Sequence, residues 1–125
     1  QTKLIDSTKV LKRFNKSFDR VLIDAPCTGL GVLRRNPDAK YKLDKATLER
    51  VLVEQKEILE TYSKLLKPEG ILVYVTCSIL PSENSEQVKT FLSNHSEFTL
   101  VEEKTLMPAE TGFDGFYMAK MTKKA

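Results

Sequence analysis

The 125-residue chain has no tryptophan, one histidine and two cysteines. Two cysteines are too few for a disulfide framework, and a single histidine excludes a histidine-rich metal site. The longest unbroken apolar stretch, Ile71 to Val75, is far shorter than the roughly 20 residues that a membrane span needs. No basic segment followed by an apolar one opens the chain, so no signal peptide is visible. We therefore expect a cytoplasmic protein in a reducing compartment, without membrane association.

Lysine and arginine are concentrated in the first third of the chain. Residues 1–42 hold ten of these side chains against four aspartates and glutamates, although the net charge of the whole chain is only +3. Such a segment suits a polyanionic partner such as RNA, but a run of charge is also typical of a solvated face. With 41% hydrophobic residues, the composition is that of one globular domain with a core.

Two short apolar runs, in residues 18–24 and 71–76, predict strands that are buried on both faces. Between them, apolar side chains recur at helical spacing as far as about Leu66. Asp44 is the candidate N-cap of this helix. The turn residues from Pro68 to Gly70 are expected to separate the helix from the second strand.

The remaining pattern predicts a second helix over residues 83–93 and two strands at 98–102 and 116–121. Ser82 is the expected cap of the second helix, and Leu4-Ile5 is read as the tail of a further strand. Strands separated by helices predict a parallel sheet, and the whole pattern a three-layer α/β fold with helices on both faces. The closing strand returns without a helix, which favours an antiparallel strand at the edge.

Two unusual segments follow the central strands, residues 24–31 (DAPCTGLG) and 76–78 (TCS). Ligands of open parallel sheets bind beyond the carboxyl ends of the strands. The fold therefore brings Cys27 and Cys77 to the same edge. One cysteine at a strand end is most often a small buried side chain. Two cysteines at neighbouring strand ends, one of them near Asp24, favour a catalytic role over a structural one.

Gly29 and Gly31 do not make a dinucleotide-binding loop, because Arg34 stands where that pattern needs its third glycine. The two glycines are expected to permit a tight turn or the close approach of a ligand. The basic side chains Arg34, Arg35 and Lys40 suit either a solvated loop or an arm that contacts phosphates at the mouth of the site. We favour the phosphate-contacting arm because it lies beside Cys27.

A thiolate can add to carbon 6 of a pyrimidine, which makes carbon 5 nucleophilic. The thiol must ionise near neutral pH, and basic neighbours favour its ionisation. A thiol-dependent hydrolase is a rival interpretation, but it needs a base beside one of the thiols. His95, the single histidine, is predicted at the far end of the second helix, and we expect it to be a capping or surface residue.

The two cysteine motifs do not stand alone. Together with residues 34–38 (RRNPD), the Pro81, Glu83 and Asn84 that follow TCS, and residues 114–120 (DGFYMAK), they closely resemble the Sun/Fmu-type RNA (cytosine-5) methyltransferases. The resemblance runs from about residue 6 to residue 120 in the right order. It implies the Rossmann-like sheet of an S-adenosylmethionine methyltransferase, of which residues 1–125 would be the C-terminal half, a single partial domain.

The resemblance also implies a reaction, the S-adenosylmethionine-dependent methylation of carbon 5 of cytosine in RNA, with ribosomal RNA as the expected partner. Cys77 matches the nucleophile of the family, and Cys27 matches the second cysteine, which is associated with product release. Asp24 matches a carboxylate at the junction of base and cofactor. Asp6 matches an acidic residue that contacts the adenosine portion of the cofactor.

The glycine-rich cofactor loop of that family would precede Gln1, so we expect this segment alone to be inactive and to bind the cofactor weakly. Its open sheet edge is expected to permit self-association. The alternative is a non-catalytic RNA-binding fragment or pseudo-enzyme of the same fold that uses the basic segment.

Overall fold

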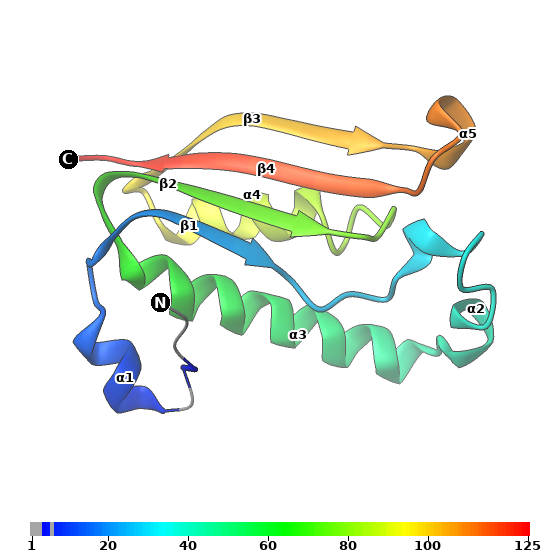
Figure 1. The fold of residues 1–125 in the computed structure, drawn as a ribbon, viewed down its shortest axis with the longest axis horizontal. Coiled ribbons are helices and arrows are strands. Elements are labelled where there is room, and N and C mark those ends of the chain that lie inside the picture. Colours follow the sequence, from blue (N-terminus) through cyan, green and yellow to red (C-terminus); the bar gives the residue numbers. More distant parts are fainter. Residues whose placement is uncertain (1–3, 6) are drawn as a thin grey trace.

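A computed structural model describes residues 4–5 and 7–125, and its secondary structure is mixed α/β (Figure 1). The helices are α1 (Thr8–Arg13), α2 (Ala39–Lys42), α3 (Lys45–Tyr62), α4 (Ser85–Asn94) and α5 (Pro108–Thr111), with short 3-10 turns at Leu30–Val32 and Ser63–Leu65. The strands are β1 (Phe18–Asp24), β2 (Leu66–Thr76), β3 (Phe98–Leu106) and β4 (Phe116–Lys123).

The described strands form one sheet in the order β1-β2-β4-β3. β1 and β2 are parallel, and β4 is antiparallel to both of its neighbours. The prediction of an antiparallel last strand is therefore confirmed. Its expected place at the edge is wrong, because β4 lies between β2 and β3 and leaves β3 as the edge strand. The connection through α4 carries β3 one position beyond β2, and β4 fills the gap that this crossover leaves.

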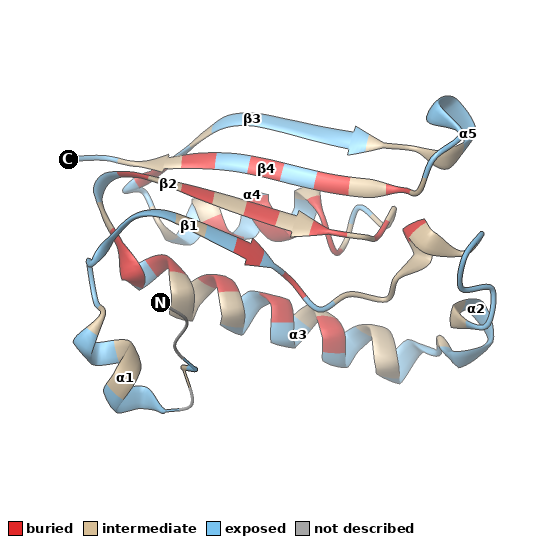
Figure 2. Cartoon of the chain, viewed as in Figure 1, coloured by how far each residue is buried: buried red, intermediate tan, exposed pale blue. Residues whose placement is uncertain are grey.

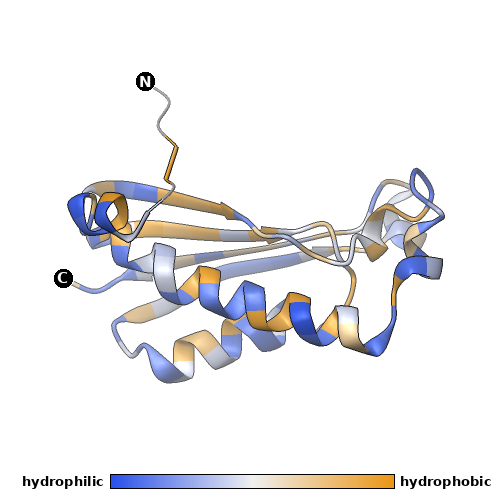
Figure 3. Cartoon of the chain, turned by 90° about the horizontal axis from the view of Figure 1, so that it is seen from below, coloured by the Kyte–Doolittle hydropathy of each residue, from blue (hydrophilic) through white to orange (hydrophobic). Residues whose placement is uncertain are grey.

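The two long helices, α3 and α4, lie on the same face of the sheet (Figure 3). Both crossovers, β1-α3-β2 and β2-α4-β3, step across the sheet in the same direction. Right-handed connections that step in one direction place their helices on one face. Of the three layers expected from the sequence, the described residues therefore form the sheet and one helical layer, and the opposite face of the sheet has no helix over it.

The core lies between the sheet and this helical layer (Figure 2). Leu72, Tyr74, Ala119 and Met121 point toward the helices and have no exposed surface. Strand residues alternate between the two faces, and on the uncovered face Leu22 is 69% exposed. The strands predicted to be buried on both faces are therefore buried on one.

Several helices and strands begin or end at residues other than those predicted. Asp44 caps α3 as expected, its carboxylate accepting the Thr47 N–H at 2.7 Å. β2 begins at Leu66, so the Pro68–Gly70 turn is an irregularity inside the strand, between the pairs Phe18–Leu66 and Arg20–Ile71. Leu4 and Ile5 are not in a strand, because the sheet adds no strand beside β1 in the described residues and the chain instead enters α1.

The start of α4 also differs from the prediction. The N-cap is Asn84 rather than Ser82, and the helix begins at Ser85. Glu83, predicted in the first helical turn, lies in a turn before the helix and is fully buried. The turn forms because the Glu83 and Asn84 N–H groups donate to the carbonyls of Leu80 and Pro81, at 3.0 and 3.1 Å.

Candidate functional site

The two cysteines lie side by side where β1 and β2 end. The parallel pairing continues just past β1, with the Ala25 N–H donating to the Val75 carbonyl at 2.9 Å. Cys27 and Cys77 each follow at the next few residues, and their sulfur atoms are 3.2 Å apart. Both thiols are partly exposed and neither is in a disulfide. The prediction that the fold brings them to one edge is confirmed.

A crossing of three loops at Gly31 keeps this edge compact. The Gly31 N–H donates to the Cys77 carbonyl at 2.9 Å, and the Gly31 carbonyl accepts the Gly115 N–H at 2.7 Å. A Cβ at position 31 would collide with the backbone oxygens of Cys77 and Gly115. Gly29 has the left-handed φ of 73° that a turn requires. Gly31 therefore permits close approach of protein backbone, not of a ligand.

Beneath the two loops lies a group of buried polar side chains that sequence reasoning did not assign. Its central member is Glu83, whose carboxylate accepts hydrogen bonds from Thr28, Gln55 and Ser78. Gln55, which lies in the helix expected between the two strands, has no exposed surface. The available signal was a glutamate five residues after Ser78, across a proline turn, in the motif quoted for the family.

Burial governs the electrostatics of the Cys27 thiol. Burial, and after it the hydrogen bond with Cys77, raises the pKa of the Cys27 thiol to about 12. Cys27 therefore keeps its proton at neutral pH and is a poor nucleophile. The basic side chains expected to favour thiol ionisation are directed elsewhere, since Arg34 donates to the Gly112 carbonyl at 3.2 Å and Arg35 to Asp114 at 2.7 Å.

Asp24 and Asp6 were the two predicted cofactor residues. Asp24 is the last residue of β1 and is exposed, at the carboxyl end of a strand, where ligands of parallel sheets bind. No hydrogen bond reaches its side chain from the part of the chain that the structure describes. Its carboxylate is thus available to a cationic or N–H-bearing ligand. Asp6 lies outside the described residues.

Arg34 and Arg35 line a cleft of about 520 Å³ beside the cysteine loops, together with Leu106, Gly112, Phe113, Asp114 and Phe116. Phe113 is 79% exposed, so the cleft joins an aromatic face to two guanidinium groups. Lys40 does not line it, but lies in α2, 4.9 Å from the Tyr41 ring. α2 and α5 both stand at the end of the sheet where β1 and β2 finish (Figure 1).

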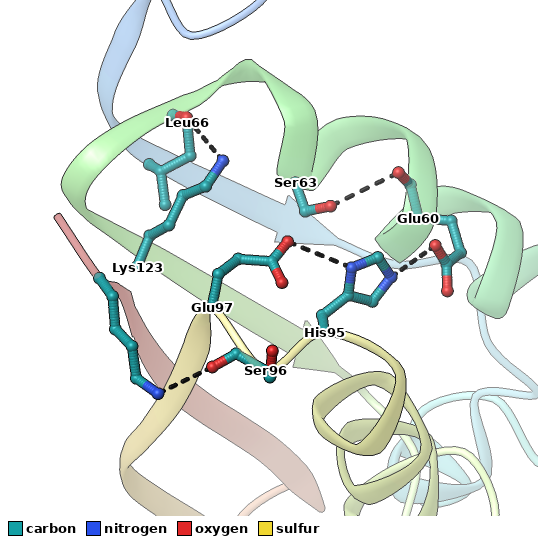
Figure 4. Close-up of polar contacts among 8 residues, drawn as sticks. Glu60, Ser63, Leu66, His95, Ser96, Glu97 and Lys123 are labelled. Atoms are coloured by element: carbon teal, nitrogen blue, oxygen red, sulfur yellow. Dashed lines mark hydrogen bonds and ion pairs between the residues drawn. The ribbon is translucent and has the colours of Figure 1, made fainter.

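His95, the single histidine, is the C-cap of α4 and contacts neither cysteine. Its Nε2 lies 2.6 Å from Glu60 and its Nδ1 lies 3.3 Å from Glu97 (Figure 4). Its ring stacks on that of Phe91. The expectation of a capping residue is confirmed. A hydrolase that relies on a cysteine–histidine pair has no such pair here.

Two classes of site have no candidate in residues 4–5 and 7–125. None of their helices combines the length and apolarity needed to cross a bilayer. No cluster of three or more metal-ligating side chains occurs among them.

Comparison with known proteins agrees with the resemblance. Residues 1–122 match the family model described as 16S rRNA methyltransferase RsmB/F. Ribosomal RNA small subunit methyltransferase B of Pasteurella multocida is 43% identical over 126 residues, and that of Yersinia enterocolitica is 44% identical over 117. These alignments cover 90% and 88% of this chain, but only 28% and 27% of the relatives. The chain thus spans little more than a quarter of their length.

Solved structures show the same fold. A methyltransferase homolog protein from Pyrococcus horikoshii has a TM-score of 0.78 at 27% identity, covering 96% of this chain and 44% of that one. NSun6 from the same organism with SFG, an analogue of S-adenosylmethionine, has a TM-score of 0.72 at 27% identity, covering 83% and 29%. A match through nearly the whole chain, with relatives above 40% identity, places it in the 16S rRNA methyltransferase RsmB/F family, S-adenosylmethionine-dependent methyltransferases with a Rossmann-like sheet.

Proposed function

We propose that the protein carrying this chain methylates carbon 5 of cytosine in ribosomal RNA through a covalent cysteine adduct. The observation that carries the proposal is the pair of thiols 3.2 Å apart, beyond the carboxyl ends of two parallel strands. A catalytic thiol must first add to the substrate and later leave it, so its sulfur takes part in both steps. A second thiol in contact with the first is suited to assist one of these steps.

In the proposed reaction the Cys77 sulfur adds to carbon 6 of the base, which makes carbon 5 nucleophilic. S-adenosylmethionine supplies the methyl group. Solvent water then accepts the carbon 5 proton, the carbon–sulfur bond breaks, and its electron pair returns to Cys77. Cys27 keeps its proton because burial raises its pKa. Its S–H is placed to donate a hydrogen bond to the departing sulfur 3.2 Å away.

Asp24 supports the assignment of the cofactor. An exposed carboxylate at the end of a parallel strand suits the ammonium or N–H groups of S-adenosylmethionine. We infer that the chain forms one wall of the cofactor site as the C-terminal half of a methyltransferase domain, since it covers little more than a quarter of its relatives. We also propose that Asp6 contacts the adenosine portion of the cofactor.

Covalent trapping tests the assignment of the cysteines. In the full-length protein, RNA that contains 5-fluorocytidine should be trapped as a stable adduct, because fluorine at carbon 5 prevents the final elimination. Cys77→Ala should abolish trapping on denaturing gels. With ordinary RNA, Cys27→Ala should still form the adduct but release it slowly, so adduct accumulates. Trapping that survives Cys77→Ala would overturn the assignment.

The alternative function is RNA binding without catalysis. The cleft that joins Arg34 and Arg35 to the exposed Phe113 favours an RNA contact under either function. We include Lys40 in this contact because α2 stands at the same end of the sheet. RNA binding that weakens steeply with salt, with no methyl transfer by the full-length protein, would support the alternative.

A further inference from the structure

Glu83 is a carboxylate with no solvent exposure, and the proposed reaction does not use it. A buried carboxylate is costly unless hydrogen bonds replace its hydration. Here four donors converge on its two oxygens, from Thr28 N–H, Thr28 Oγ1, Gln55 Nε2 and Ser78 Oγ. Four donated hydrogen bonds use all the acceptor positions that the two oxygens of a carboxylate offer.

Two of these donors belong to the residue after Cys27. The Thr28 N–H donates to Oε1 at 2.8 Å and its hydroxyl donates to Oε2 at 2.7 Å. Pro26, the residue before Cys27, is linked to Glu83 through Gln55. The Gln55 Nε2 donates to the Pro26 carbonyl at 2.9 Å and to the Glu83 carboxylate at 3.1 Å. Cys27 is therefore fixed on both sides.

The Cys77 loop is fixed in the same way. Ser78, the residue after Cys77, donates from its hydroxyl to Glu83 Oε2. Thr76, the residue before Cys77, donates to the Asn84 side chain at 2.5 Å. Glu83 is itself anchored, because the buried Tyr74 hydroxyl donates to its backbone carbonyl at 2.7 Å. One carboxylate thus contacts the loops of both cysteines, which are 50 residues apart in sequence.

We propose that Glu83 is a positioning residue: its carboxylate holds the Cys27 and Cys77 loops together and thereby sets the distance between the two thiols. The effect of that distance on catalysis rests on the proposed function. The role of Glu83 in holding the loops together does not depend on it. Glu83→Gln replaces one acceptor oxygen with an amide N–H₂ among four donors. Two donors then lack a partner, and the loops separate.

Phenylarsine oxide measures this geometry without any methyl transfer. It condenses with two neighbouring thiols, forming two arsenic–sulfur bonds and releasing one water molecule. In the full-length protein, mass spectrometry should show one arsenical bridging Cys27 and Cys77. The concentration of dithiothreitol that removes half of it should fall about tenfold or more in Glu83→Gln, because the effective concentration of one thiol at the other falls. Cys27→Ser should lose the bridge.

Glu86→Gln is the matched control, since Glu86 is exposed in the first turn of α4, and it should behave as the unmodified protein. Circular dichroism establishes that each variant is folded. If Glu83→Gln does not fold, Thr28→Val removes one donor at constant shape and should lower arsenical retention in the same direction. Retention equal to that of the unmodified protein in the folded variant, or no bridge in the unmodified protein, would overturn the proposal.

Methyl-transfer kinetics separate this proposal from the proposed function. Glu83→Gln should lower kcat about 10²-fold, the cost of misplacing reacting groups by about 1 Å, with an unchanged KM for the methyl donor. An intact bridge in a protein that transfers no methyl group would refute the function and leave the positioning role standing. Weakened bridging with unchanged kcat would show that the spacing set by Glu83 does not matter for methyl transfer, and would refute that part of the proposal.

Discussion

At the scale of single residues, Gly31 is the position where three backbone segments meet. Its N–H and carbonyl bind Cys77 and Gly115, and a Cβ there has no free space. Gly31→Ala should therefore lower the free energy of unfolding by about 1–3 kcal/mol, the usual range for overpacking. Urea denaturation measures the change, with the exposed Asn36→Ala in the same loop as control. Equal midpoints for both variants would mean that the loops separate at little cost.

The same scale shows what the sequence could predict of the site. Cys27 and Cys77 were identified because each lies within three residues of a strand end, and strand ends of a parallel sheet meet by topology alone. Glu83 was placed in a helix, because its buried contacts come from β2, α3 and the loops after β1 and β2 at once and leave no periodic signal. Arg34 and Arg35 were expected beside Cys27, but they bind Gly112 and Asp114 in the loop after α5, partners that spacing could not predict.

At the scale of elements, α3 depends on its N-terminal cap. The Asp44 carboxylate accepts the Thr47 N–H, and this hydrogen bond lowers the pKa of Asp44 below its ordinary value. Because the pKa is lowered in the folded state, the cap stabilises the fold at pH values above the ordinary pKa of 3.8. This stabilisation is lost as the pH falls through the pKa of the folded state. Asp44→Ala should lower the Tm at pH 7 by a few degrees and should lower it less at a pH well below 3.8. Calorimetry at both pH values measures this.

The control for the cap is Lys45→Ala at the next position. Its ion pair with Glu49 is exposed on both sides, so its loss should leave the Tm nearly unchanged. A Tm of Asp44→Ala that falls by the same amount at both pH values would contradict the electrostatic account. The element boundaries that sequence reasoning predicted well, such as β1 and this cap, are those set by local side chains. The order of β3 and β4 is set by tertiary pairing and was not predictable.

At the scale of the whole molecule, one face of the sheet carries apolar side chains with no helix over it. By strand alternation and register, Leu22 lies beside Val73, and Met118 lies beside Val75 on this face. Leu22 and Met118 are 69% and 37% exposed. β1 also has no partner on its outer side among the described strands. An apolar face next to an unpaired strand edge favours association.

The 125-residue chain on its own is therefore expected to pair with a second copy through this face. Light scattering after size-exclusion chromatography should give a dimer mass, and Leu22→Glu should restore the monomer. Val53→Glu is the control, because Val53 is exposed on α3, on the helical side of the sheet, and should leave the dimer intact. A monomer at every concentration would exclude self-association of the segment.

The interior position of β4 has a consequence for how the protein is made. During synthesis, β3 is made before residues 116–123, yet β4 is its hydrogen-bonded neighbour in the finished sheet, and no other described strand pairs with it. Pairings between distant segments form slowly, and unpaired edges are exposed while they wait. The sheet edge that carries the two cysteines is also completed late, because Gly115, which binds Gly31, directly precedes β4. A nascent chain released before that point would carry both cysteines without the Gly115 contact that closes this edge.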